Sequence, residues 1–195
     1  IEYLIVCPLV FLAGFIDAIA GGGGLISLPA YLIAGLPPHA AIGTNKFSAC
    51  LGTMVATWHF ARNGIIYWKH ALPAVVTALA GSWLGAEIAL WVNADAFKVV
   101  MLIVLPLTGG YVLFKKPFRT DKKPFSDAKT ILITLALAFL IGIYDGFYGP
   151  GTGTFLILLL TAVAHVSLNE AAGTTKVINL STNISALVVF LLNGV

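Results

Sequence analysis

The decisive stretch of the sequence is GFIDAIAGGGGLISLP, at residues 14–29. It joins an apolar segment, residues 3–20, to a shorter one, residues 25–36, through four consecutive glycines, Gly21–Gly24. A helix that crosses a hydrocarbon layer of about 30 Å needs roughly 20 predominantly apolar residues. Residues 25–36 are too few for that. The stretch therefore predicts a long helix, a glycine turn and then a re-entrant or broken half-helix.

The composition indicates a membrane environment. The chain is 59% hydrophobic and 10% charged, with a mean hydropathy of +0.97, whereas soluble domains are about 45–50% apolar and about 25% charged. We therefore expect an integral membrane protein in a lipid bilayer, and not a disordered chain, a nucleic-acid-binding domain or a disulfide scaffold. The other long apolar segments are 40–61, 71–92, 97–114, 130–148 and about 170–193, and a second short one is 153–166.

An internal repeat organises these segments. Shifting the chain by 130 residues aligns residues 21–65 with 151–195, with twelve identities in 45 positions. Internal repeats are common in secondary transporters, whose substrate lies near the bilayer midplane between discontinuous helices. The sequence thus predicts an all-α polytopic protein of two homologous repeats, each with a glycine-rich half-helix. The repeats could be parallel or inverted, and the charge pattern favours parallel.

The domain boundaries follow from the repeat. We expect a first transmembrane repeat at 1–114, a basic linker at 115–129 and a second repeat at 130–195. Six of the eleven basic residues lie in the linker, which the positive-inside rule places in the cytoplasm. The second repeat has no counterpart of residues 66–114, so we expect a fragment or a divided chain rather than the loss of two helices.

Ionisable residues inside the apolar segments are the first functional candidates. Lys46 and Lys176 occupy the same place in the two repeats, within GTNK and GTTK. A charge at bilayer depth is costly, so it usually faces a protein-lined cavity. The alternatives are that each lysine snorkels to the interface or pairs with a carboxylate. Asp17 and Asp145 are then proton carriers or charge partners of the lysines, and Glu87 is a candidate proton relay.

Glycine turns and nearby polar side chains complete the predicted substrate site. A helix that starts after a glycine turn offers free N–H groups and a positive dipole end to an oxyanion. The alternatives are close helix packing for the glycines and interhelical hydrogen bonds for the polar residues. The predicted substrate-binding residues are Gly21, Gly22, Gly23, Gly24, Thr44, Asn45, Lys46, Gly149, Gly151, Thr152, Gly153, Thr175, Lys176, Asn179 and Asn183.

The motifs resemble those of the sulfite exporter TauE/SafE family. The resemblance rests on GFIDAIAGGGGLISLP at residues 14–29, GTNK at 43–46 and YDGFYGPG at 144–151, and it extends over essentially the whole chain. It implies secondary transport of a small anion, with the family motif falling on Gly21–Gly24, Lys46, Gly149, Gly151 and Lys176. The second turn departs from the family pattern because it reads GPGTG instead of a pure glycine run.

These observations lead to one functional expectation. We expect a multi-pass secondary transporter of the cytoplasmic (inner) membrane that exports small sulfur oxyanions such as sulfite or sulfoacetate. The alternatives are an anion channel and a transporter of small carboxylates. The sequence has no catalytic or metal-ligand cluster, so we expect no enzyme activity, no cofactor and no metal. Small residues at 78–86 would permit a homodimer.

Overall fold

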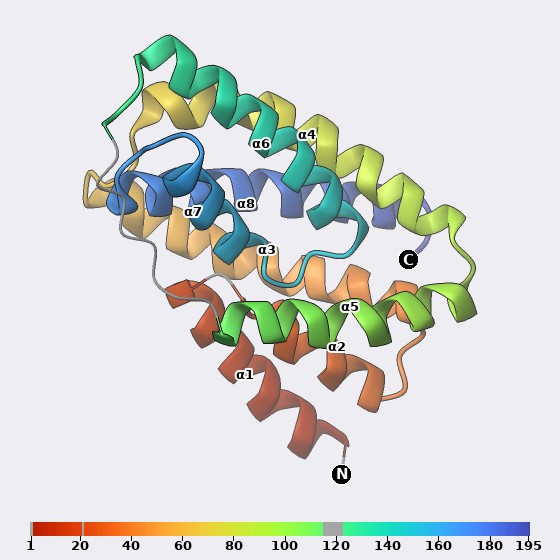
Figure 1. The fold of residues 1–195 in the computed structure, drawn as a ribbon. Helices are drawn as coiled ribbons and strands as arrows, with labels where there is room; N and C mark the ends of the chain where they lie inside the picture. The colour runs from red at the N-terminus through yellow and green to blue at the C-terminus, as the bar shows by residue number, and fades with distance from the viewer. Residues whose placement is uncertain (1, 21, 115–122) are drawn as a thin grey trace.

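The computed structural model of the chain describes residues 2–20, 22–114 and 123–195 (Figure 1). The described residues form helices and contain no strand, which confirms the all-α prediction. The helices are α1 (Glu2–Ala20), α2 (Gly24–Ile33), α3 (Pro38–Arg62), α4 (Trp68–Trp91), α5 (Ala94–Phe114), α6 (Asp127–Phe147), α7 (Thr152–Ala162) and α8 (Leu168–Leu192). The helix ends lie within a few residues of those that the apolar segments predict.

Not every long helix has the composition of a membrane span. Within the described residues, four helical segments are long and apolar enough to cross a bilayer: Trp68–Trp91, Ala94–Val112, Asp127–Phe147 and Leu168–Leu192. The sequence predicts six such segments. The other two predicted segments are α1, which spans Glu2–Ala20, and α3, whose first half carries polar side chains such as Asn45 and Lys46. Those polar residues mark where the helix borders a polar interior instead of lipid.

Two short helices, α2 and α7, each follow a turn. They contain ten and eleven residues, which at 1.5 Å per residue amounts to about 15–17 Å, or half of a bilayer core. Gly149 and Gly151, which flank Pro150 in the turn between α6 and α7, have φ angles of 100° and 81°. Only glycine adopts such angles readily, so the chain can reverse its direction at this turn.

A crossing of small residues holds α4 against α6. An added Cβ at Gly81 or Gly85 would overlap the backbone oxygens of Phe139 and Ile143, so the two helix backbones are in direct contact. Small residues allow this close approach. The small residues at 78–86 therefore pack against α6 within the chain. They no longer support the expected homodimer, which was based on their being free to contact a second copy.

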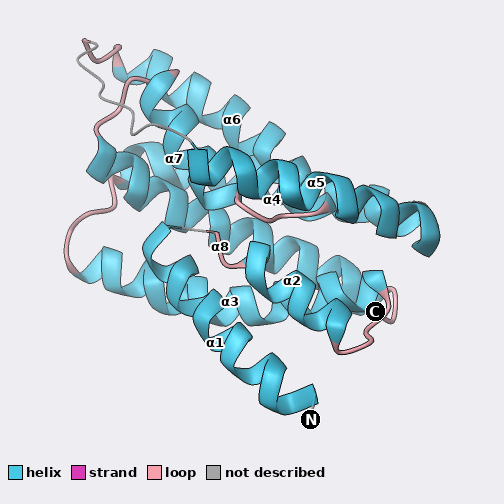
Figure 2. Cartoon of the chain, turned by 60° about the horizontal axis from the view of Figure 1, so that its bottom comes forward, coloured by secondary structure: helices cyan, strands magenta, loops and turns pink. Residues whose placement is uncertain are grey.

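Helix α8 is the central helix of the arrangement. It packs against α3, α4 and α7, and 67% of its most apolar stretch is buried inside the protein. Two serine hydroxyls fasten it to α4, because Ser82 Oγ donates to the carbonyl of Thr182 at 2.6 Å and Ser185 Oγ donates to the carbonyl of Leu79 at 2.8 Å. Figure 2 shows α3 and α8 side by side, with α1 and α2 on the outer side of α3.

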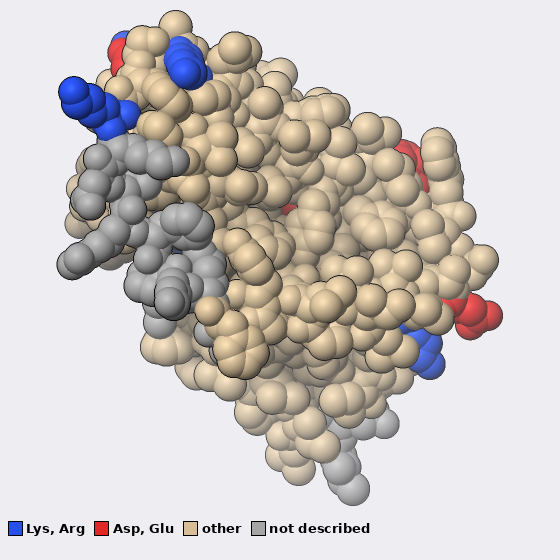
Figure 3. All heavy atoms as spheres, in the orientation of Figure 1, with Lys and Arg blue, Asp and Glu red and all other residues tan. Residues whose placement is uncertain are grey.

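The outer surface is largely apolar. Large hydrophobic side chains are exposed on α1, α3, α4 and α5, and Figure 3 shows a broad face without charge, with Lys, Arg, Asp and Glu mostly at its edges. Water would disfavour such a surface, whereas lipid covers it at no cost. The fold is therefore that of a multi-pass membrane protein with its polar residues turned inward.

Candidate functional site

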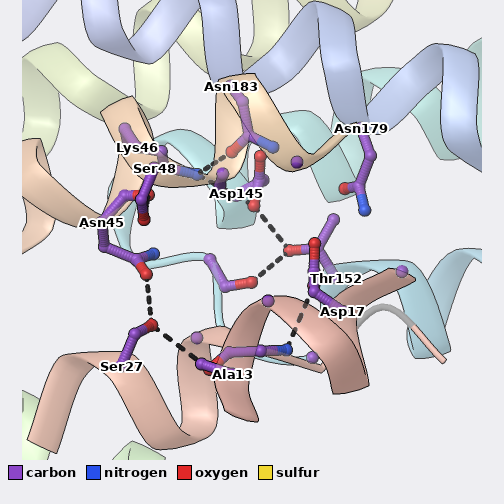
Figure 4. Close-up of a pocket in the computed structure, with 18 of the residues that line it drawn as sticks. Ala13, Asp17, Ser27, Asn45, Lys46, Ser48, Asp145, Thr152, Asn179 and Asn183 are labelled. Atoms are coloured by element: carbon purple, nitrogen blue, oxygen red, sulfur yellow. Dashed lines mark hydrogen bonds and ion pairs between the residues drawn. The ribbon is translucent and has the colours of Figure 1, made fainter. Parts of the chain in front are cut away.

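A cavity of about 170 Å³ lies where α1, α2, α3, α6, α7 and α8 meet (Figure 4). Its walls come from both halves of the chain and include both glycine turns. The predicted functional residues that line it are Asp17, Gly23, Gly24, Asn45, Lys46, Asp145, Gly149, Gly151, Thr152, Gly153, Asn179 and Asn183. The fold thus brings residues that are far apart in the sequence to one polar cavity.

Lys46 and Asp145 form a buried ion pair at this cavity. Lys46 Nζ lies 2.9 Å from Asp145 Oδ1, and the two side chains are 1% and 4% exposed. The ammonium also donates to Asn183 Oδ1 at 3.2 Å. An ammonium has three N–H donors, and the third has no partner among the described residues. Lys46 therefore does not snorkel outward. It pairs with a carboxylate and still borders the cavity.

The turn after α6 packs directly on this ion pair. A Cβ added to Gly149 would lie 2.9 Å from both Lys46 Nζ and Asp145 Oδ1. Thr152 Oγ1, at the start of α7, lies 2.7 Å from Asp145 Oδ1 and 2.6 Å from the Gly149 carbonyl oxygen. The backbone thus approaches the charged groups closely, and the glycine is needed for that approach.

The first half of the chain places its aspartate differently. Asp17 Oδ1 accepts a hydrogen bond from the Gly23 backbone N–H at 3.1 Å, so the carboxylate lies at the start of α2. Lys176, which is 3% exposed, donates from Nζ to the backbone carbonyl of Asp17 at 2.9 Å. Each lysine therefore contacts the aspartate of the other half, Lys46 through the side chain and Lys176 through the main chain.

The two glycine turns lie side by side. A Cβ added to Gly24 would lie 3.2 Å from Pro150 Cα and 3.5 Å from Asn45 Nδ2. Ser27, one turn into α2, donates to Asn45 Oδ1. Both turns and the polar start of α3 thus share one wall of the cavity. Ser27 was not among the residues predicted from the sequence, although a small polar residue in a short apolar helix is a usable signal.

Several predicted residues lie elsewhere. Thr44 is exposed, Gly22 and Thr175 are buried away from the cavity lining, and Glu87 is half-buried on α4 outside the lining. Lys176, which was predicted to bind substrate together with Lys46, is also absent from the lining. Gly21 lies outside the described residues. The described part of the chain contains no group of three or more His, Cys, Asp or Glu that could hold a metal ion.

An apolar helical exterior around a polar cavity with buried charges defines a class, the multi-pass membrane transport proteins. The particular family follows from comparison. Residues 6–195 match the family described as "Sulfite exporter TauE/SafE", and the chain belongs to that family.

The relatives of the chain bear transporter names. It is 42% identical to "Probable membrane transporter protein ORF9" of Sinorhizobium sp. over 187 residues, which cover 94% of this chain and 70% of the relative. It is 36% identical to a "Probable membrane transporter protein" of Haemophilus influenzae, with 94% and 72% covered. It is 34% identical to "Probable membrane transporter protein YfcA" of Escherichia coli, with 94% and 68% covered. No solved structure matches the chain.

Proposed function

We propose that this member of the TauE/SafE family carries small sulfur oxyanions, such as sulfite or sulfoacetate, out of the cell across the cytoplasmic membrane. The observation that carries the proposal is the buried ammonium of Lys46 at the wall of the polar cavity. A charge at bilayer depth is retained when it has a function. A cation at a cavity whose third N–H donor has no partner in the described part of the chain suits a small anion.

Neutral donors support the same ligand class. The amide side chains of Asn45, Asn179 and Asn183 line the cavity with Lys46, and amide nitrogens donate to oxyanions without adding charge. A volume of about 170 Å³ is sufficient for one small oxyanion and a few waters. Lys176 is proposed to hold α1 against α8, since its ammonium reaches the Asp17 backbone and not the cavity.

The repeated order of helices supports a carrier with two related halves. A long, a short and a long helix of 19, 10 and 25 residues precede a second set of 21, 11 and 25 residues. Both short helices begin at the cavity, since Gly24 and Thr152 line it, and discontinuous helices of this kind hold the substrate in secondary transporters. We propose that movement of the halves opens the cavity to each side in turn.

Flux into proteoliposomes tests the proposal. Purified protein is reconstituted, and uptake of labelled sulfite, sulfoacetate and acetate is followed with and without the same anion inside. We expect saturable sulfite or sulfoacetate uptake that internal anion stimulates, and loss of at least nine-tenths of it in Lys46→Gln. Lys98→Gln is the matched control, because this exposed lysine near the start of α5 does not line the cavity.

The other outcomes separate the rival functions. Uptake that neither saturates nor responds to internal anion identifies an anion channel. Preference for acetate identifies a carboxylate transporter. Full uptake by Lys46→Gln removes the ammonium from the mechanism.

A further inference from the structure

The two oxygens of Asp145 have unequal surroundings. Oδ1 faces Lys46 Nζ at 2.9 Å and Thr152 Oγ1 at 2.7 Å. Oδ2 is buried and has no hydrogen-bond partner among the described residues. A buried carboxylate oxygen without a partner loses its hydration and gains nothing in return, which is unfavourable. A bound proton removes most of that cost, because it neutralises the carboxylate.

The charges around the cavity are balanced before any ligand arrives. Lys46 and Lys176 contribute two positive charges, and Asp145 and Asp17 contribute two negative ones. A single anion that enters this low-dielectric region leaves one uncompensated negative charge, which is expensive. One proton restores the balance. The anion and Asp145 would otherwise compete for the same ammonium.

We infer that Asp145 is a proton-binding site that is loaded together with the anion, so that one proton accompanies each monovalent anion. The inference rests on the proposed function and names its coupling ion. The anion replaces Asp145 at Lys46 Nζ, and the proton from solution binds Asp145 Oδ2. When the anion leaves, Lys46 returns to Asp145 and the proton is released on the same side.

The groups around Asp145 indicate that Asp145 is the carboxyl that takes up and releases the proton. Lys46 of α3 contacts Asp145 directly, and the thiol of Cys50 on the same helix lies within the electrostatic range of the carboxylate. The charged group on α1 is Asp17, whose carboxylate already accepts the Gly23 N–H. Tyr144 shares α6 with Asp145, and its hydroxyl donates to the Pro150 carbonyl at 2.6 Å.

Of the remaining described elements, α8 contributes one charge near the cavity, Lys176, whose ammonium contacts the Asp17 backbone carbonyl and not Asp145. From α7 and α8, neutral Thr152 and Asn183 approach the ion pair, and the acidic residue of α4, Glu87, is outside the cavity lining. Tyr148, just after α6, has a buried hydroxyl without a partner in the described chain. Among the acidic residues that the structure describes, Asp145 alone is paired with the ammonium that the anion needs.

Proton counting during binding tests the inference. Titration calorimetry in buffers of different ionisation enthalpy measures how many protons the protein takes up per bound anion. The probe is methanesulfonate, because its sulfonate group takes up no proton near neutral pH. We expect one proton per anion in the wild type and none in Asp145→Asn. We also expect wild-type affinity to rise about tenfold per unit of falling pH, and Asp145→Asn affinity to stay constant.

Controls distinguish failure of the coupling from failure of the function. Asp95→Asn alters an exposed carboxylate in the first turn of α5. This variant should still take up one proton per bound anion. Binding with no proton uptake in the wild type overturns the coupling and leaves the proposed function intact, as does a requirement for Na⁺ in its place. If neither methanesulfonate nor sulfite binds, the proposed function falls and the inference with it. If only sulfite binds, the count is made with sulfite, and the wild type should exceed Asp145→Asn by one proton.

An infrared measurement covers the case in which Asp145→Asn does not fold. In the wild-type protein in vesicles, adding the anion should produce the carbonyl band of a protonated carboxylic acid in the difference spectrum. The double variant Lys46→Gln/Asp145→Asn, which removes both charges, should lack the band. Absence of the band from the wild type overturns the inference without any variant.

Discussion

The Nζ of Lys46 lies 2.9 Å from Oδ1 of Asp145, and the pair joins α3 to α6 across the two halves of the chain. Both side chains are almost fully buried. In such a pair the mutual attraction offsets the loss of hydration only while both partners are present. The same contact is therefore a structural link and the part of the cavity wall that an anion would have to open.

Removing one charge of the pair should destabilise the protein. Lys46→Gln leaves Asp145 buried without its cation, which typically costs about 3–5 kcal/mol. Lys46→Gln/Asp145→Asn removes both charges and should recover most of that loss. Thermal unfolding in detergent measures both variants, together with Asp145→Asn alone.

The comparison needs a lysine that has no buried partner. Lys98→Gln should change stability by less than about 0.5 kcal/mol, since surface substitutions usually do. If the double variant is no more stable than the sum of the single variants predicts, the pair carries no coupling energy and the structural role assigned to it is wrong.

Gly149→Ala should impair both stability and transport. The alanine would have to adopt a φ of 100°, and its Cβ would lie 2.9 Å from Lys46 Nζ and from Asp145 Oδ1. Backbone strain of this kind costs about 1–3 kcal/mol, and the ammonium must also move. We expect sulfite flux to fall at least tenfold at equal protein amount in the vesicle. Gly109→Ala, which meets nothing within 4 Å, is the control and should transport normally.

The sequence predicted the helices well because apolar length and glycine turns decide them locally. Residues 25–36 and 153–166 were predicted as short helices, and α2 and α7 each begin one residue earlier and end three or four residues before those ranges do. The position of Lys46 in an apolar segment favoured a lysine that faces a protein-lined cavity, with snorkelling to the interface or pairing with a carboxylate as the alternatives, and the structure shows the carboxylate pair. These conclusions follow from the cost of charge in an apolar surrounding, which does not depend on the details of packing.

The sequence could not decide which lysine borders the cavity. Lys46 and Lys176 have the same place in the repeat, yet one meets the Asp145 side chain and the other the Asp17 backbone. The difference arises from the turns: one turn places Gly149 directly on the ion pair, while the other gives Asp17 the Gly23 N–H as a partner. Such choices depend on contacts between distant segments, which no local pattern encodes.

The crossing of α4 and α6 should be sensitive to a single methyl group. Gly85→Ala would push a Cβ into the backbone of Ile143 and Phe147. Overpacking in a well-packed interface typically costs about 1–3 kcal/mol, so the unfolding temperature in detergent should fall. Gly110→Ala adds the same methyl group where nothing lies within 4 Å and should be neutral or slightly stabilising. Equal stability of the two variants would mean that the helices do not cross this closely.

The orientation of the chain should be readable from the two ends of α4 and its neighbour α5. The positive-inside rule places Lys69 on the cytoplasmic side with the basic linker, and one crossing later Asp95 falls outside. In a variant with Cys7 and Cys50 replaced by alanine, Lys69→Cys and Asp95→Cys each introduce one exposed thiol. A membrane-impermeant maleimide added to whole cells should label the cysteine at position 95 and reach position 69 only after permeabilisation.

Because α4 is long and apolar enough to span the bilayer, labelling of both positions from outside would mean that α4 does not cross it. Labelling of position 69 alone would mean that the chain is inserted in the opposite direction, and that the proton and anion of the proposed mechanism enter from the other side.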